Sequence, residues 1–97
     1  MYRVAYSERV RDELRQLIRK ATPLGMAQDV VRAVQLIDHI LRVYPQYGEP
    51  LRDLVLEPAR LMIATVPPLV VRYSLDEERN LVLVPVPFRP LANTGLR

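Results

Sequence analysis

The sequence contains no cysteine and no tryptophan, and it has a single histidine, His39. Without cysteine there is no disulfide framework, no thiolate metal site and no cysteine nucleophile. One histidine cannot form a histidine-cluster metal site. Neither Ser7 nor Ser74 lies in the GxSxG pattern that positions the nucleophile of many serine hydrolases. A chain of 97 residues leaves no room for a separate cofactor domain, so we expect no metal site and no cofactor.

Long hydrophobic runs are also missing. The longest apolar stretch, residues 61–71, is interrupted by Thr65, Pro67 and Pro68 and is far shorter than the roughly 20 residues that span a bilayer. Arg3 and Glu8 lie where a signal peptide would need its apolar stretch. We therefore expect a soluble, cytoplasmic protein that does not bind membranes.

What the chain does contain is a folding composition, with 49% apolar and 26% charged residues. Its length predicts a single domain over residues 1–90, followed by a flexible tail over residues 91–97. Residues 1–48 carry the whole net charge of +3, and 13 of the 14 basic residues are arginine. Arginine suits phosphate or carboxylate recognition, but this net charge is too small to predict nucleic-acid binding by itself.

The N-terminal half has the pattern of a strand followed by two helices. Residues 2–6 alternate in character and predict a strand, and Ser7 is the expected N-cap of a helix. One apolar stripe at helical spacing follows, made of Val10, Leu14, Leu17, Ile18 and Ala21. After a break at residues 22–25, a second stripe predicts a helix that Pro45 ends. This stripe comprises Met26, Val30, Ala33, Val34, Ile37, Leu41 and Tyr44, and is widened by Leu36 and Ile40.

Beyond Pro50 the apolar period changes to two. Residues 51–57 are interpreted as a connector or a short helical turn, and strands are predicted at 60–66, 69–75 and 81–86. Short turns between them indicate an antiparallel meander. Pro85 and Pro87 place the end of the last strand at a partly unpaired edge. The predicted fold class is α+β: an N-terminal strand, a two-helix hairpin and a three-stranded antiparallel meander packed on the helices.

Three arginines, two on the predicted strands and one just after the last strand, are candidate ligands for phosphate, carboxylate or a partner. Arg60, Arg72 and Arg89 could line one face of the meander, with Tyr73 beside Arg72; alternatively, each is an ordinary surface arginine. Consecutive turn residues diverge, so the acidic residues 76–78 favour a solvated turn over a metal site. His39 lies beside Asp38 in the polar sector of its helix, which favours a solvated surface position.

The order of elements resembles the RelE/ParE superfamily of bacterial type II toxins. The opening YRVAYSERVRDELRQL is similar to the family's strand-then-helix start, and YPQYGEPLRDL resembles its link into the sheet. The closing VVRYSLDEERNLVLVPVPFR resembles the last family hairpin, which ends on a basic residue. The resemblance implies the same α+β fold and assigns that basic residue to Arg89.

Other residues of the ribonuclease-type members have no counterpart here. The family's early strand arginine falls at Leu69 or Val70, no tyrosine follows Tyr73, and the only lysine, Lys20, lies on the first helix. Arg72 and Arg89 are the remaining weak candidates for a catalytic role. They can stabilise a phosphate but are poor bases.

Three functions follow from the resemblance and stay open at this point. The first is a toxin-like protein that acts by binding a protein target and is neutralised by an antitoxin-like partner, which occupies an edge or groove of the sheet. The second is a ribosome-dependent mRNA endonuclease of the RelE type, and the third is a non-toxic protein of the same shape. The molecular target and the oligomeric state, including a homodimer, are not fixed by the sequence.

Overall fold

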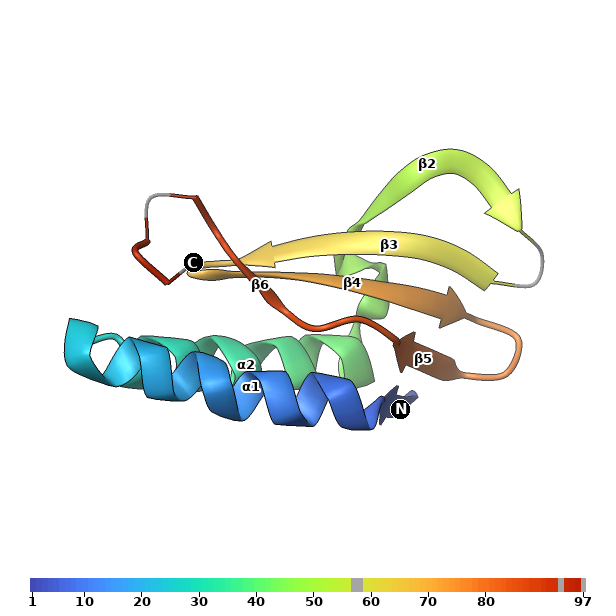
Figure 1. Cartoon of the computed structure of the whole chain (residues 1–97). Coiled ribbons are helices and arrows are strands. Elements are labelled where there is room, and N and C mark those ends of the chain that lie inside the picture. Colours follow the sequence, from blue (N-terminus) through green and yellow to red (C-terminus); the bar gives the residue numbers. More distant parts are fainter. Residues whose placement is uncertain (57–58, 93, 97) are drawn as a thin grey trace.

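The computed structural model describes residues 1–56, 59–92 and 94–96, with side chains described outside residues 52–58. Two helices form one layer and cover one face of a β-sheet (Figure 1). In chain order the elements are β1 (Arg3–Tyr6), α1 (Glu8–Ala21), η1 (Thr22–Leu24), α2 (Ala27–Val43), η2 (Pro45–Tyr47), β2 (Glu49–Leu56), β3 (Ala59–Val66), β4 (Leu69–Asp76), β5 (Leu81–Val84) and β6 (Arg89–Pro90).

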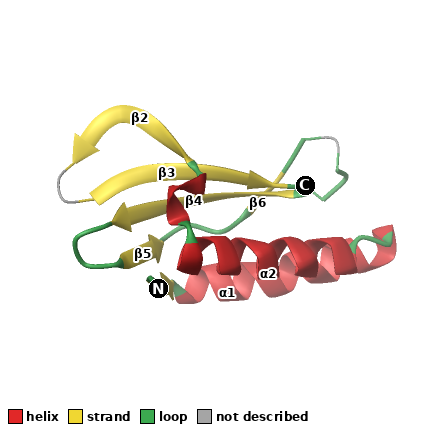
Figure 2. Ribbon diagram, turned by 180° about the vertical axis from the view of Figure 1, so that it is seen from behind, coloured by secondary structure: helices red, strands yellow, loops and turns green. Residues whose placement is uncertain are grey.

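The sheet is mixed and has the strand order β1-β5-β4-β3-β2, with β6 paired to β4. Strand β1 runs parallel to β5, and all the other pairs are antiparallel. The two helices therefore connect β1, at one edge of the sheet, to β2 at the other edge; Figure 2 shows them from behind. The predicted fold class, an α+β domain with an N-terminal strand, two helices and an antiparallel meander, is confirmed.

The meander begins one strand earlier than the sequence indicates. Residues 51–57 were interpreted as a connector or a helical turn, and this is wrong, because residues 49–56 form β2 and pair with β3. A proline early in a segment argues against a central strand, but β2 is the last strand of the sheet, where a missing N–H is tolerated. The register shifts between Pro50 and Val55, which marks an irregularity in the ladder. Glu57 lies outside the described residues.

Both helices form where the apolar stripes predict them. The Ser7 side chain caps α1 by accepting a hydrogen bond from the Val10 N–H at 3.3 Å, as expected for an N-cap serine. The break at residues 22–25 is a turn of 3-10 helix that ends at Gly25, whose positive φ of 69° suits glycine. The prediction for Leu36 is wrong, since this side chain is 50% exposed on the outer side of α2.

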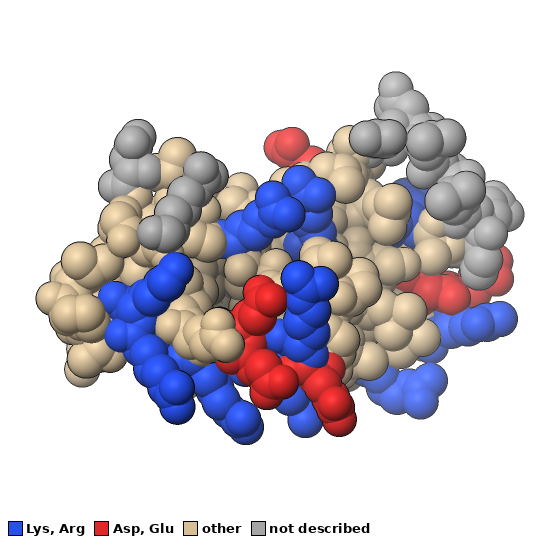
Figure 3. Space-filling view, in the orientation of Figure 1, with Lys and Arg blue, Asp and Glu red and all other residues tan. Residues whose placement is uncertain are grey.

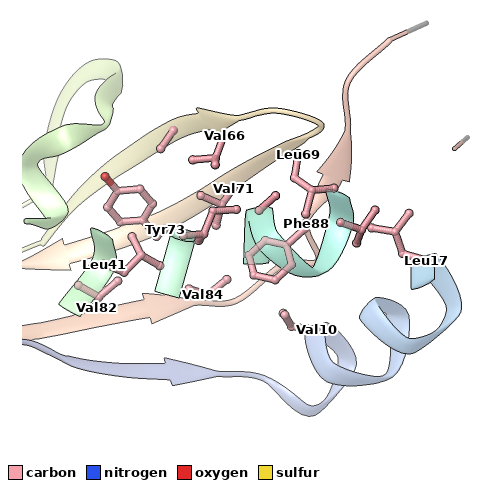
Figure 4. Close-up of a cluster of buried hydrophobic side chains, with 14 of the residues drawn as sticks. Val10, Leu17, Leu41, Val66, Leu69, Val71, Tyr73, Val82, Val84 and Phe88 are labelled. Atoms are coloured by element: carbon pink, nitrogen blue, oxygen red, sulfur yellow. The ribbon is translucent and has the colours of Figure 1, made fainter. Parts of the chain in front are cut away.

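The core lies between the helices and the sheet. On β4, Leu69, Val71, Tyr73 and Leu75 all face the helices and are at most 1% exposed. Figure 4 shows Leu69, Val71 and Tyr73 with Val82, Val84 and Phe88 from the adjoining segments. The Tyr73 hydroxyl donates to the Pro45 carbonyl and accepts from the Gly48 N–H at 3.1 Å. A Cβ at Gly48 would collide with that hydroxyl and lie 2.9 Å from the Ile63 carbonyl oxygen.

The segment 91–97, expected to be a flexible tail, includes residues 93 and 97, which lie outside the described part. Among the described residues, the Leu91 N–H donates to the Pro68 carbonyl at 2.8 Å, and Leu96 is 1% exposed. None of the described helices is long and apolar enough to cross a membrane.

Candidate binding site on the outer face of the sheet

The sheet face turned away from the helices, which we call the outer face, is open and largely apolar. Successive side chains of a strand point to opposite faces, so Leu61, Ser74 and Leu83 form one row across β3, β4 and β5. Leu61 is 43% and Leu83 42% exposed. In the next row, Ile63 lies opposite Arg72.

A gap in the sheet lies beside Arg72. Strand β5 pairs with β4 only at residues 74–76, and β6 pairs with β4 only at residues 69–70. Between these two contacts the chain passes through Pro85 and Pro87, which have no N–H to donate to a ladder. The prolines thus end β5 at Val84, two residues earlier than predicted, and leave a hollow at this point of the outer face.

This hollow, which we call the proline notch, is a cavity of about 230 Å³ lined by Val70, Arg72, Pro87, Arg89 and Leu91 among others. Arg89 pairs with Val70 across the β4–β6 ladder, and Arg72 is two residues further along β4. Diagonal neighbours of this kind are about 7–8 Å apart. Both arginines are exposed, and neither makes an ion pair with the side chains that the structure describes.

The structure brings together two of the predicted site residues and separates the others. Arg60 shares the alternation of Met62 and lies opposite Leu75 on the helical side of the sheet, with its guanidinium 4.0 Å from Glu77. Tyr73 is in the core. The hypothesis that three arginines share one face is therefore wrong for Arg60, whose position along β3 directs it to the opposite face. Only Arg72 and Arg89 remain together.

Of the remaining candidates, His39 on α2 and Glu77 and Glu78 in the turn after β4 are exposed, as the sequence predicts. The prediction of a solvated position for Asp76 is wrong, because this residue is only 7% exposed. Asp76 is the last residue of β4 and accepts a hydrogen bond from the Arg79 N–H of the following turn at 3.1 Å. In the described part of the chain, no three acidic or histidine side chains are close enough together to hold a metal ion.

The outer-face leucines are the residues that sequence reasoning missed. The alternation of side chains along a strand carried a signal for them, because Leu61 and Leu83 point to the face opposite that of their buried neighbours in the chain. Which leucines meet in one row depends on the strand register, and that is set only in the folded sheet.

A polar cluster lies between β1 and α2. Asp38 accepts hydrogen bonds from the Tyr6 hydroxyl at 2.7 Å and from Arg42 Nε at 2.8 Å. Burial and then the adjacent Asp38 carboxylate raise the pKa of Tyr6 well above its ordinary value. Partial burial alone would raise the pKa of Asp38, but the hydrogen bonds from Arg42 and Tyr6 outweigh it and lower that pKa. The Tyr6–Asp38 hydrogen bond joins β1 to α2.

The chemistry of the notch is that of a cationic binding site. Two guanidinium groups can hold a carboxylate or phosphate by charge-assisted hydrogen bonds, and they remain protonated at neutral pH. The exposed leucines beside them offer apolar contact. Comparison with protein-family models, with curated proteins and with solved structures finds no match to this chain.

Proposed function

We propose that this protein is the toxin-like component of a bacterial type II toxin–antitoxin pair of the RelE/ParE kind, and that it acts in the cytoplasm by binding a protein. The order of elements supports the proposal, since a strand, a helical hairpin and an antiparallel meander follow one another within 97 residues. The sequence patterns that resemble the family lie at β1–α1, at the link from α2 to β2, and at the β4–β5 hairpin.

The observation that carries the binding role is the row of exposed leucines beside Arg72. Leu61 and Leu83 on the outer face are both more than 40% exposed. Contact of apolar side chains with water is unfavourable, and a partner that covers this face would remove that cost. Protein interfaces combine apolar contacts with arginine anchors and contain few other charges at their centre. The outer face offers this combination to an antitoxin-like protein or to a protein target.

The endonuclease reading has weaker support from the same residues. Cleavage of RNA needs a group that takes a proton from the 2′-hydroxyl and one that protonates the leaving oxygen. The described residues that line the notch are arginines, prolines and aliphatic residues, which can bind a phosphate without transferring protons. RNA and the ribosome are therefore the alternative partners, and cleavage is an outcome that the experiment below tests.

The test uses tightly controlled expression of the chain in bacteria, with growth recorded and messenger-RNA ends mapped. Growth arrest without new RNA ends is the expected result. Messenger RNA cut in register with the codons would support the endonuclease function instead of the binding role, provided that Arg89→Ala abolishes the cleavage and keeps partner binding. Absence of any arrest would favour the non-toxic alternative.

Partner binding is measured with the product of an adjacent short reading frame that encodes a DNA-binding antitoxin. We expect Arg72→Ala or Leu83→Asp to weaken this complex about tenfold or more, since interface anchors typically contribute that much. Arg32→Ala is the matched control, because Arg32 is also an exposed arginine and lies on α2 in the helical layer. Equal losses for Arg72→Ala and Arg32→Ala would mean that the outer face is not the interface.

A further inference from the structure

A second cavity lies on the other side of Arg89, between α1 and the C-terminal segment. It measures about 400 Å³, and we call it the α1 cavity. One wall is a single face of α1, formed by Glu13, Gln16, Leu17 and Lys20, which are three or four residues apart. Phe88, Arg89 and Leu96 contribute to the opposite wall. Figure 1 shows α1 running beneath the segment that leads into β6.

The floor and the rim of the α1 cavity differ in character. Leu17, Phe88 and Leu96 form an apolar floor and are 8%, 7% and 1% exposed; the first two are labelled in Figure 4. Gln16, Lys20 and Arg89 are exposed and form the polar rim. The cavity therefore offers an apolar surface below a set of hydrogen-bond donors.

The rim has an excess of positive charge. Among the described residues that line the cavity, the one carboxylate is that of Glu13, which already accepts from Arg9 Nε at 3.1 Å. Lys20 and Arg89 make no ion pair with the side chains that the structure describes. Lys20 is also the single lysine among 14 basic residues. Figure 3 shows that basic side chains outnumber acidic ones on this side of the molecule.

We propose that the α1 cavity binds an organic phosphate with a flat apolar body, about the size of a mononucleotide. A phosphate monoester carries about −1.5 to −2 charges at pH 7, which matches Lys20 and Arg89 together, whereas one carboxylate would neutralise only one of them. The body of the ligand would cover Leu17 and Phe88. The cavity volume lies within the range of small-molecule sites, roughly 300–1,000 Å³. This site goes beyond the proposed function and does not depend on it.

The test is isothermal titration calorimetry on the full chain with AMP as the probe, and with ribose 5-phosphate, adenosine and inorganic phosphate for comparison. AMP should bind with the highest affinity, because it alone offers both the charge and the apolar ring. If adenosine binds as tightly as AMP, Lys20 and Arg89 do not bind the phosphate. If inorganic phosphate or ribose 5-phosphate binds as tightly as AMP, the apolar floor does not contribute to binding. No measurable binding of AMP would overturn the site.

Variants then locate the site. Lys20→Met should weaken AMP binding about tenfold or more, as expected for the loss of one charge-assisted contact. Arg19→Met is the matched control, since Arg19 is the exposed neighbour in the same last turn of α1 and lies outside the cavity lining. Equal losses in the two variants would indicate general attraction to a basic helix and would overturn the proposal.

The same variants separate this proposal from the one above. Arg72 lines the proline notch and not the α1 cavity, whereas Lys20 lines the α1 cavity and not the notch. Arg72→Ala should weaken the partner complex and leave AMP binding unchanged, and Lys20→Met should do the reverse. If Arg72→Ala weakens AMP binding as much as Lys20→Met does, the phosphate site is not in the α1 cavity.

Discussion

Strand β4 contributes to two faces of the sheet that differ in burial and in charge. On the inner face, Leu69, Val71, Tyr73 and Leu75 are at most 1% exposed and pack beneath the helices. On the outer face, Arg72 is exposed and lies among side chains that reach solvent. Alternate residues of this one strand thus build the core and the solvent-facing surface. Stability should therefore be most sensitive to inner-face changes, and partner binding to outer-face changes.

The largest effect is expected from the inner face. Leu69→Ala should lower the free energy of unfolding by about 2–5 kcal/mol, because it removes a fully buried side chain and leaves a cavity. Chemical denaturation measures this. Leu83→Ala on the outer face, where the side chain is 42% exposed, should cost less than about 1 kcal/mol. Equal losses at the two positions would mean that the outer face is also packed.

The next effect concerns the polar contact at the end of the inner face. Tyr73→Phe should lower the free energy of unfolding by about 1–3 kcal/mol, because the buried Pro45 carbonyl and the Gly48 N–H would lose their partner. Thermal unfolding followed by circular dichroism measures the change. Tyr44→Phe is the control, since Tyr44 is 59% exposed, and it should leave the midpoint unchanged. A similar shift in both variants would show that the Tyr73 hydroxyl is not a structural anchor.

The smallest effect is a pH dependence of stability that comes from Asp38, next to β1. Because the pKa of Asp38 is lower in the folded chain than its ordinary value, its contribution to stability is present above about pH 4, where the unfolded carboxyl is ionised, and is lost as the pH falls through the folded pKa. Asp38→Asn should therefore cost about 1 kcal/mol at pH 7, an amount kept small by the exposure of the Asp38–Arg42 pair.

Denaturation at pH 7 and at pH 3 checks this prediction. The difference between wild type and Asp38→Asn should shrink at the lower pH. Tyr6→Phe removes only one of the two hydrogen bonds to Asp38 and should show a smaller pH dependence. A difference between wild type and Asp38→Asn that is constant over this range would exclude the Asp38 carboxylate as its source.

Much of the fold could be predicted because local periodicity reports which side of an element is buried. The stripes from Val10 to Ala21 and from Met26 to Tyr44 predicted both helices, and Ser7 predicted the first helix start. Strand β2 could not be predicted in this way. Its pairing with β3 begins at Glu49 and Pro50, and a proline so early in the segment is acceptable only because the strand lies at the edge of the sheet.

The candidate site was predictable in part. Arg72 and Arg89 were named from their strands, and the structure places both at the proline notch. Arg60 was grouped with them, but the register of β3 against β4 places it opposite Leu75 on the helical side. The α1 cavity had no sequence signal, because Lys20 and Arg89 are 69 positions apart and meet only where the C-terminal segment passes α1.

Composition and the spacing of apolar residues within one segment were enough to predict the fold class and the helix limits and to exclude thiol chemistry. Tertiary structure decided which side chains share a surface. The rows on the outer face follow from hydrogen-bond register between strands, and both cavities follow from the point at which Pro85 and Pro87 release the chain from the sheet. Register and chain exit are interactions between distant segments, so no local pattern contains them.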